Sequence, residues 1–526
     1  MKGLKIFPKF NLYTGLIAFL LLSTTSCTKD FGDINVDKNS ITSNRIGALH
    51  LKFLFTAAVE SVPVGDQTAE NLYSQQYAQY IANNATYFPT DRYAINMGWA
   101  RSAFNPIYVN VVPQLQTIFE NTESNSAEYA MANIWWVFAF QRTTDYWGPI
   151  PYFEAGQPGD GVTYDSQRDI YMDFFERLKT SISVLKNNLD KTPFGGAADV
   201  IYKGKVEKWI KFANTLRLRY AVRISGVDPA TAKAEAEAAV ADGVFTVSPD
   251  DDALMERNTR DINKLSEMSE WFEFNMSAAM ESILKGYQDP RISEYFLPAQ
   301  NSGTYEGLRN GLSIAQLALP QNNKLANSHI GPRWSSPTRG GWASYFSTPQ
   351  NLMCTAEAYF LRAEGVLLGW NMGGSLQDLY EAGIRNSMLQ WGITDPGIID
   401  AYIDGTTIPI APGDYLNSPP AADVPVRFDA SDIAIQKKQI AVQKWLALFP
   451  DGNEGWADYR RNRSVLPLYP VANSDNPDIP DPNANWIRRL PFLIYEYETN
   501  KEGVKKGVEH LNGPDKISTP LWWDVH

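Results

Sequence analysis

Two polar, aromatic stretches of the sequence carry the side chains best suited to holding a ligand. The first combines amide, charged and aromatic groups: Asn83, Tyr87, Asp91, Arg92, Tyr93 and Trp99. The second places arginines and aromatic residues among glycines and prolines: Arg333, Trp334, Arg339, Trp342 and Tyr345. Flat aromatic faces beside bidentate hydrogen-bonding groups suit sugar rings or peptide side chains. We therefore predict a noncovalent ligand site in these two loops.

Signatures of catalysis are missing from the sequence. It has no HExxH, GxSxG, GxxxxGKS/T or CxxC pattern, and none of its four histidines lies within metal-ligand spacing of another. Metal chemistry through His or Cys is therefore disfavoured, and we expect no metal and no cofactor. The acidic run 250–252 follows a proline, so a turn or helix cap explains it better than a calcium site. A helical glycoside hydrolase stays open as an alternative, because it needs only two carboxylates about 5–9.5 Å apart.

Cys27 follows a segment typical of bacterial export signals. Three lysines precede an apolar run at 12–22 and small residues at 23–26, in the order of n-region, h-region and cleavage site. The cysteine is placed as in a lipoprotein lipobox, although Thr24 stands where leucine is usual. We expect removal of residues 1–26 and a membrane tether of acyl chains such as palmitate on Cys27. An ordinary secretory signal with an unmodified cysteine is the alternative.

The composition predicts a large acidic protein with its own core. The chain has 526 residues, of which 44% are hydrophobic and 13% aromatic, enough for a large core or several lobes. Its net charge of −12 becomes −15 when the three lysines of residues 1–26 are removed. Negative charge of this size disfavours nucleic acid as a partner. If Cys27 is acylated, Cys354 has no other cysteine in the chain with which to form a disulfide. We expect Cys354 to be a small buried hydrophobic residue.

Helical periodicity dominates the rest of the chain. Apolar residues at helical spacing over 206–224 predict an amphipathic helix. Residues 351–392 hold two such stripes around a turn at 371–374, with small residues that permit close packing, which is the layout of a tetratricopeptide-type pair. Further helices are expected at 49–60, 69–82, 128–144, 168–189, 230–242 and 433–449. Long irregular segments are expected at 83–105, 298–350, 393–430 and 450–526.

Five stretches together resemble the SusD/RagB group of nutrient-binding outer-membrane lipoproteins. They are "CTKDFGDINVDKN" from residue 27, "TDYWGPIPY" at 144–152, "AEAYFLRAEG" at 356–365, "KWLALFPDGNEGWADYRR" at 444–461 and "DKISTPLWWD" at 515–524. Considered without the resemblance, most of these residues are expected to have structural roles rather than to contact a ligand. The aromatic residues of 144–152 would pin a turn at Gly148, Asp458 would pair with Arg460 or Arg461, and Trp522 and Trp523 would anchor the C-terminal segment.

The resemblance implies a fold and a role. The fold would be mainly α, with tetratricopeptide-like helix pairs in a superhelical scaffold, long irregular loops and little β structure. The protein would sit lipid-anchored on the outer surface of the outer membrane and pass an oligosaccharide, or in the RagB-like branch an oligopeptide, to a SusC-like TonB-dependent transporter. We divide the chain into a signal peptide (1–26), an N-terminal helical half (27–250), a loop-rich ligand-binding part (251–350), a tetratricopeptide-like part (351–449) and an irregular C-terminal part (450–526).

Overall fold

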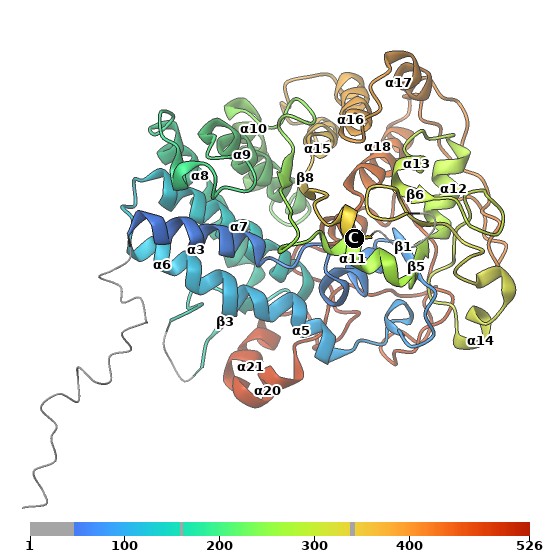
Figure 1. Ribbon diagram of the computed structural model, residues 1–526, viewed down its shortest axis with the longest axis horizontal. Coiled ribbons are helices and arrows are strands. Elements are labelled where there is room, and N and C mark those ends of the chain that lie inside the picture. The colour runs from blue at the N-terminus through green and yellow to red at the C-terminus, as the bar shows by residue number, and fades with distance from the viewer. Residues whose placement is uncertain (1–46, 158–160, 337–341, 526) are drawn as a thin grey trace, which may run out of the picture. The chain divides into compact units, whose positions relative to one another are not determined.

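The computed structural model describes residues 47–157, 161–336 and 342–525 (Figure 1). Cys27 and Arg339 lie outside these ranges. Ala48–His526 form one structural unit. Within the described residues, no helix has both the length and the apolar character that a membrane crossing requires.

Long helices that pack one on the next form the main part of this unit (Figure 1). The first set is α7 (Ala127–Trp147), α8 (Gln167–Lys186), α9 (Val206–Arg223) and α10 (Pro229–Asp242). The second set is α15 (Thr355–Leu367), α16 (Leu376–Gln390), α18 (Ile433–Leu448) and α19 (Gly452–Asn462). The two sets meet where α15 packs on α9. The expectation of a mainly helical protein built from helix pairs is confirmed.

The remaining α-helices have between 4 and 13 residues. The α-helices are α3 (Ala48–Glu60), α4 (Ser74–Tyr77), α5 (Met97–Pro106), α6 (Val112–Glu120), α11 (Lys264–Trp271), α12 (Ala278–Gly286), α13 (Ile292–Tyr295), α14 (Ile314–Leu317), α17 (Pro396–Ile403), α20 (Ile494–Thr499) and α21 (Lys501–His510). Two π-helical segments, η2 (Gln67–Asn71) and η4 (Ile107–Val111), and four 3-10 turns, η3 (Thr90–Arg92), η5 (Pro193–Gly195), η6 (Pro320–Asn322) and η7 (Trp342–Tyr345), complete the helical part of the described chain.

Strands are short and pair two by two. The antiparallel pairs are β1 (Ile81–Asn83) with β5 (Phe274–Met276), β2 (Ile150–Pro151) with β3 (Tyr164–Asp165), β4 (Ala253–Met255) with β8 (Gln350–Met353), and β6 (Phe296–Leu297) with β7 (His329–Ile330). Three of the four pairs join segments far apart in sequence. They therefore fix loops to one another rather than forming a layer of the core.

The expected pair at 351–392 is α15 with α16, and a glycine sets how closely the two helices approach. A Cβ atom at Gly383 of α16 would lie 2.7 Å from a ring carbon of Phe360 on α15. Real Cβ atoms do not come so close, so glycine is needed at this contact. Cys354 caps the start of α15 and is 2% exposed, as expected for a small buried hydrophobe.

Two expected features of the chain are wrong. The helix expected over 69–82 is broken, because Gln79 adopts φ 56° and the chain continues as strand β1. The segments expected to be irregular also contain helices: α5 begins within 83–105, α14 lies in 298–350, α17 in 393–430, and α19, α20 and α21 in 450–526. The Pro-Asp-Gly sequence at 450–452 ends α18, but its aspartate, Asp451, then caps α19 by accepting a hydrogen bond from the amide of Glu454 at 3.3 Å.

The core joins segments from both halves of the chain. The hydroxyl of Tyr80 donates to the carbonyl of Trp445 at 2.9 Å, and the Trp445 indole donates to the carbonyl of Ala78 at 2.8 Å. Trp523, which is fully buried, donates to Asp145 of α7 at 2.9 Å, so the tryptophan does anchor the C-terminal segment. The turn after α7 is also as expected, because Gly148 has φ 81° and the aromatic residues around it are buried.

Candidate ligand-binding site

The two predicted ligand loops meet on one segment, α11 and β5 (Figure 1). Strand β1, which begins the first loop, pairs with β5 through Asn83 and Phe274. The second loop starts at β7, which lies against β5, and its η7 turn packs on α11. There the hydroxyl of Ser266 donates to the carbonyl of Tyr345 at 2.9 Å. The sequence alone did not show that 264–276 joins the loops.

Tyr87, one of the predicted site residues, is exposed, with 63% of its surface open. Its hydroxyl donates to the carboxylate of Glu273, whose other oxygen accepts a hydrogen bond from the Gln67 amide at 2.7 Å. Burial and the Glu273 carboxylate raise the pKa of Tyr87 to about 12. The phenol is therefore neutral at physiological pH, and its ring is held in a fixed direction by a charge-assisted hydrogen bond.

A second exposed aromatic ring, Trp271, ends α11 and is 44% exposed. The next residue, Phe272, adopts a left-handed conformation with φ 54° and turns inward. Its ring is 3% exposed and stacks on the His329 ring at 3.9 Å. This turn buries Phe272 and leaves the Trp271 indole at the surface, two residues from Glu273.

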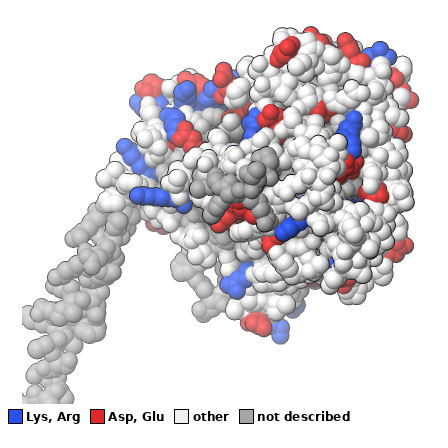
Figure 2. Space-filling model, turned by 45° about the vertical axis from the view of Figure 1, so that its right-hand side comes forward, with Lys and Arg blue, Asp and Glu red and all other residues white. Residues whose placement is uncertain are grey.

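Phe88 packs beneath Tyr87 and Trp99, and Trp271 is linked to Tyr87 through Glu273, which lies two residues along the chain and accepts the Tyr87 hydrogen bond. Phe88 is 7% exposed and contacts Tyr87, Trp99 and Phe274 with ring centroids 4.6, 5.4 and 6.1 Å away. We call the surface formed by Tyr87, Trp99, Trp271, Glu273 and Gln67 the aromatic surface. Figure 2 shows one face of the molecule that is largely uncharged, with basic and acidic side chains scattered over it. Aromatic rings beside a carboxylate and an amide suit a ligand with hydroxyl or amide groups.

Other predicted residues of the first loop hold the loop from inside. Asn83 is 1% exposed and donates to the carbonyls of Ala85 and Phe88. Asp91, 2% exposed, accepts from the amide of Gly311, and burial raises its pKa to about 6. Two further members are also buried and serve the loop in the same way: Arg92, which pairs with Asp475 at 2.7 Å, and Tyr93. Ligand contact by these four remains a prediction.

The second loop presents less open surface than its composition suggests. Trp334 is 4% exposed and packs against Trp391 and Phe449. Arg333 covers the Trp391 ring at 4.6 Å and pairs with Glu294 at 3.2 Å. They line a cavity of about 80 Å³, well below the roughly 300–1,000 Å³ of ligand pockets. Tyr345 is partly buried and Trp342 lies in η7, so their contact with a ligand stays a prediction.

Trp271, Glu273 and Gln67 are the members of the aromatic surface that sequence reasoning missed. The signal was present at 265–272, because Leu265, Met268 and Phe272 form the buried stripe of α11. Trp271 falls off that stripe, so helical spacing predicts that it faces solvent. An exposed tryptophan beside a sharp turn is a stronger indicator of binding than aromatic content alone.

A family model described as "Susd and RagB outer membrane lipoprotein" matches residues 33–524. The chain belongs to this SusD-like family of outer-membrane lipoproteins. The five sequence motifs identified the family correctly, and with it the mainly helical fold and the outer-membrane location. SusD-like proteins are binding proteins rather than enzymes, so the glycoside hydrolase alternative is dropped.

Solved structures give the same fold. A chitin-binding SusD homologue from Flavobacterium johnsoniae is 36% identical with a TM-score of 0.82, and the match covers 91% of this chain and 99% of that one. A SusD-like protein from Bacteroides thetaiotaomicron is 30% identical with a TM-score of 0.80, covering 90% and 99%. A further chitin-binding protein is 27% identical with a TM-score of 0.72, covering 90% and 100%. Among curated proteins, no significant match was found.

Proposed function

We propose that this SusD-like lipoprotein binds an oligosaccharide of the chitin type on its aromatic surface and delivers it to a SusC-like TonB-dependent transporter. The observation that carries the proposal is the exposed Tyr87 ring, which is hydrogen-bonded to the Glu273 carboxylate that the Gln67 amide also contacts, together with the exposed Trp271 two residues before Glu273. Sugar rings stack on such faces, and carboxylate and amide groups bond their hydroxyls and N-acetyl groups. Two structural relatives described as chitin-binding support the same ligand class.

Binding without turnover is the role expected of the site. The two aromatic rings supply contact area, while the polar groups fix orientation. Within the described ranges, no group of three or more His, Cys, Asp or Glu side chains is placed to hold a metal ion. The transporter partner follows from the family resemblance and is part of the proposal.

Calorimetry with purified protein tests the ligand class. Chitohexaose, maltohexaose and a neutral hexapeptide are titrated separately, and the chitohexaose sample is analysed for cleavage after long incubation. We expect chitohexaose to bind most tightly and to remain intact. Tighter binding of the hexapeptide would favour the RagB-like peptide alternative instead.

Co-purification tests the partner. The native lipoprotein is extracted from outer membranes in mild detergent and isolated by affinity. A TonB-dependent barrel protein is expected in the eluate in near-stoichiometric amount. Recovery of the lipoprotein alone, after cross-linking in intact cells, would contradict delivery to a transporter.

A further inference from the structure

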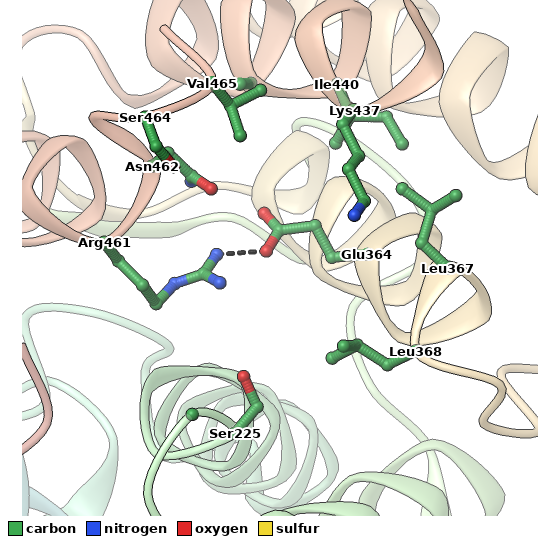
Figure 3. A pocket seen from close by; sticks show the side chains of 12 residues that line it. Ser225, Glu364, Leu367, Leu368, Lys437, Ile440, Arg461, Asn462, Ser464 and Val465 are labelled. Atoms are coloured by element: carbon green, nitrogen blue, oxygen red, sulfur yellow. Dashed lines mark hydrogen bonds and ion pairs between the residues drawn. The ribbon is translucent and has the colours of Figure 1, made fainter. Parts of the chain in front are cut away.

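A cavity of about 340 Å³ lies where α9, α15, α18 and α19 meet, away from the aromatic surface (Figure 3). Its volume falls in the range of about 300–1,000 Å³ that is usual for small-molecule sites. None of its lining residues belongs to the two ligand loops or to α11 and β5. It is therefore a separate feature of the helical scaffold.

One side of the cavity is apolar. It is formed by Leu367 and Leu368 at the end of α15, Ile440 of α18 and Val465 after α19 (Figure 3). Leu368 is 48% exposed, which is unusual for a large apolar side chain beside a concave surface. An apolar group entering the cavity would remove this surface from water, which is favourable.

The other side of the cavity carries Arg461, and part of its guanidinium group bonds no carboxylate of the protein. Arg461 donates to Glu364 and to Asp458 through Nη2 alone, and both oxygens of Glu364 are already bonded by Arg461 and Lys444. Within the described residues, the Nε and Nη1 atoms of Arg461 donate to no protein acceptor. These two nitrogen atoms of Arg461 can therefore donate hydrogen bonds to a ligand in the cavity.

Lys437 adds a second cation. Its amine points into the cavity (Figure 3), and no carboxylate of the described chain pairs with it. The next residue, Lys438, differs in this respect, because its amine pairs with Asp423 at 2.8 Å. Of the charged residues that line the cavity, Lys437 and Arg461 are positive and Glu364 is negative, so one positive charge is left in excess there.

We propose that this cavity is a second ligand site, which binds a carboxylate carried on an apolar group. The Lys437 amine and the Nε and Nη1 atoms of Arg461, which Glu364 does not use, bind the carboxylate, and the planar fork of Arg461 suits it. The apolar group packs against Leu367, Leu368, Ile440 and Val465. A single excess charge favours a monoanion over a phosphate, whose second charge Glu364 would oppose. Two sources present this chemistry: a free small acid and the C-terminal carboxylate of a polypeptide.

Calorimetry with matched acids and amides tests the site. The small probe is N-acetyl-phenylalanine and the polypeptide probe is a hexapeptide ending in Leu-Phe, each compared with its C-terminal amide on the full protein. Each acid that binds is expected to bind at least about tenfold more tightly than its amide, because only the acid uses the two cations. Binding of both acids assigns the site to small acids and chain termini alike, and binding of the peptide alone assigns it to chain termini. Equal affinity of acid and amide, or binding of neither acid, overturns the proposal.

Variants of the lining residues test whether the acid binds in this cavity. Lys437→Gln and Leu368→Asn are each expected to weaken the acid at least about fivefold, whereas the matched control Lys438→Gln is expected to leave its affinity unchanged. Lys437 and Leu368 are exposed, so both variants should fold, which thermal unfolding checks. Unchanged affinity in the Lys437 variant overturns the assignment. Chitohexaose affinity, measured on the same samples, should be unaffected, so failure here is separate from failure of the glycan proposal.

Discussion

Arg219 and Glu357 form a bidentate ion pair whose two side chains are each only 1% exposed. Nε and Nη2 of Arg219 donate to the two carboxylate oxygens of Glu357 at 2.6 Å each. The pair joins α9 to α15, the contact that holds the two sets of helices together. Glu357 belongs to the "AEAYFLRAEG" motif, so this part of the motif contributes to the scaffold.

Breaking this pair should destabilise the protein strongly. Glu357→Ala leaves a buried guanidinium with less compensation, and we expect a loss of roughly 3–5 kcal/mol in the free energy of unfolding. Unfolding in guanidinium chloride measures this loss of stability. Lys233→Ala is the matched control, since its pair with Glu237 is exposed and spans 3.8 Å; we expect less than about 0.5 kcal/mol. A comparable loss in both variants would contradict the structural role.

Asp251 should stabilise the folded protein at neutral pH and lose this effect in acid. Burial alone would raise the pKa of this carboxyl, but hydrogen bonds from Lys208 and Lys211 at 2.7 and 2.8 Å lower it below its usual 3.8. A lowered pKa means that the ionised carboxylate stabilises the fold above about pH 4 and that this stabilisation is lost as the pH falls further. Asp251→Asn should therefore cost about 1–3 kcal/mol at pH 7, and the difference from wild type should shrink below pH 4. Denaturation curves from pH 7 to 3 test this, and a pH-independent difference would count against it.

The α15–α16 contact should not tolerate a methyl group. Gly383→Ala places a Cβ against the Phe360 ring, and we expect a loss of roughly 1–3 kcal/mol in unfolding free energy despite the better helix propensity of alanine. The double variant Gly383→Ala/Phe360→Leu should recover part of this loss, because the smaller side chain makes room. Chemical denaturation of both variants checks the prediction. A Gly383→Ala protein as stable as wild type would mean that the helices can move apart freely.

Aromatic substitutions should show which side chains contribute to the affinity for chitohexaose. Trp271→Ala and Tyr87→Ala are each expected to weaken chitohexaose at least about tenfold, equal to about 1.4 kcal/mol. Tyr497→Ala, at a 41% exposed position on α20, serves as control. Trp342→Ala and Trp334→Ala test the second loop in the same calorimetric series. If only these last two reduced affinity, the ligand site would have to move to that loop.

Replacing Cys27 should free the protein from the membrane without unfolding it. Cys27→Ala is expected to appear in soluble fractions with unchanged circular dichroism, because attachment then depends on acyl chains alone. Fractionation of cells with an antibody to the protein measures the distribution. Sedimentation of the variant with outer membranes in high salt would show that another contact holds it there.

The sequence predicted the long helices well and the site only in part. Regular apolar spacing marked α7, α8, α9, α15, α16 and α18, because their stability depends on buried stripes that the sequence displays directly. It could not show that β1 and β7 would both reach β5, since that depends on pairing over long distances in sequence. Nor could it show that polar residues such as Asn83 and Asp91, predicted to contact ligand, also satisfy buried backbone groups of the loops; their ligand contact stays a prediction.

The hydrogen bonds that Trp445 makes with Tyr80 and Ala78 have a consequence for how the chain acquires its structure. They join residues at least 365 positions apart, so this part of the core cannot form until most of the chain is available. A repeat array folds by adding each unit to its neighbour, whereas contacts this distant make folding slow. Until these distant contacts form, apolar segments such as 130–140 are exposed, and we expect chaperones or aggregation to compete for them.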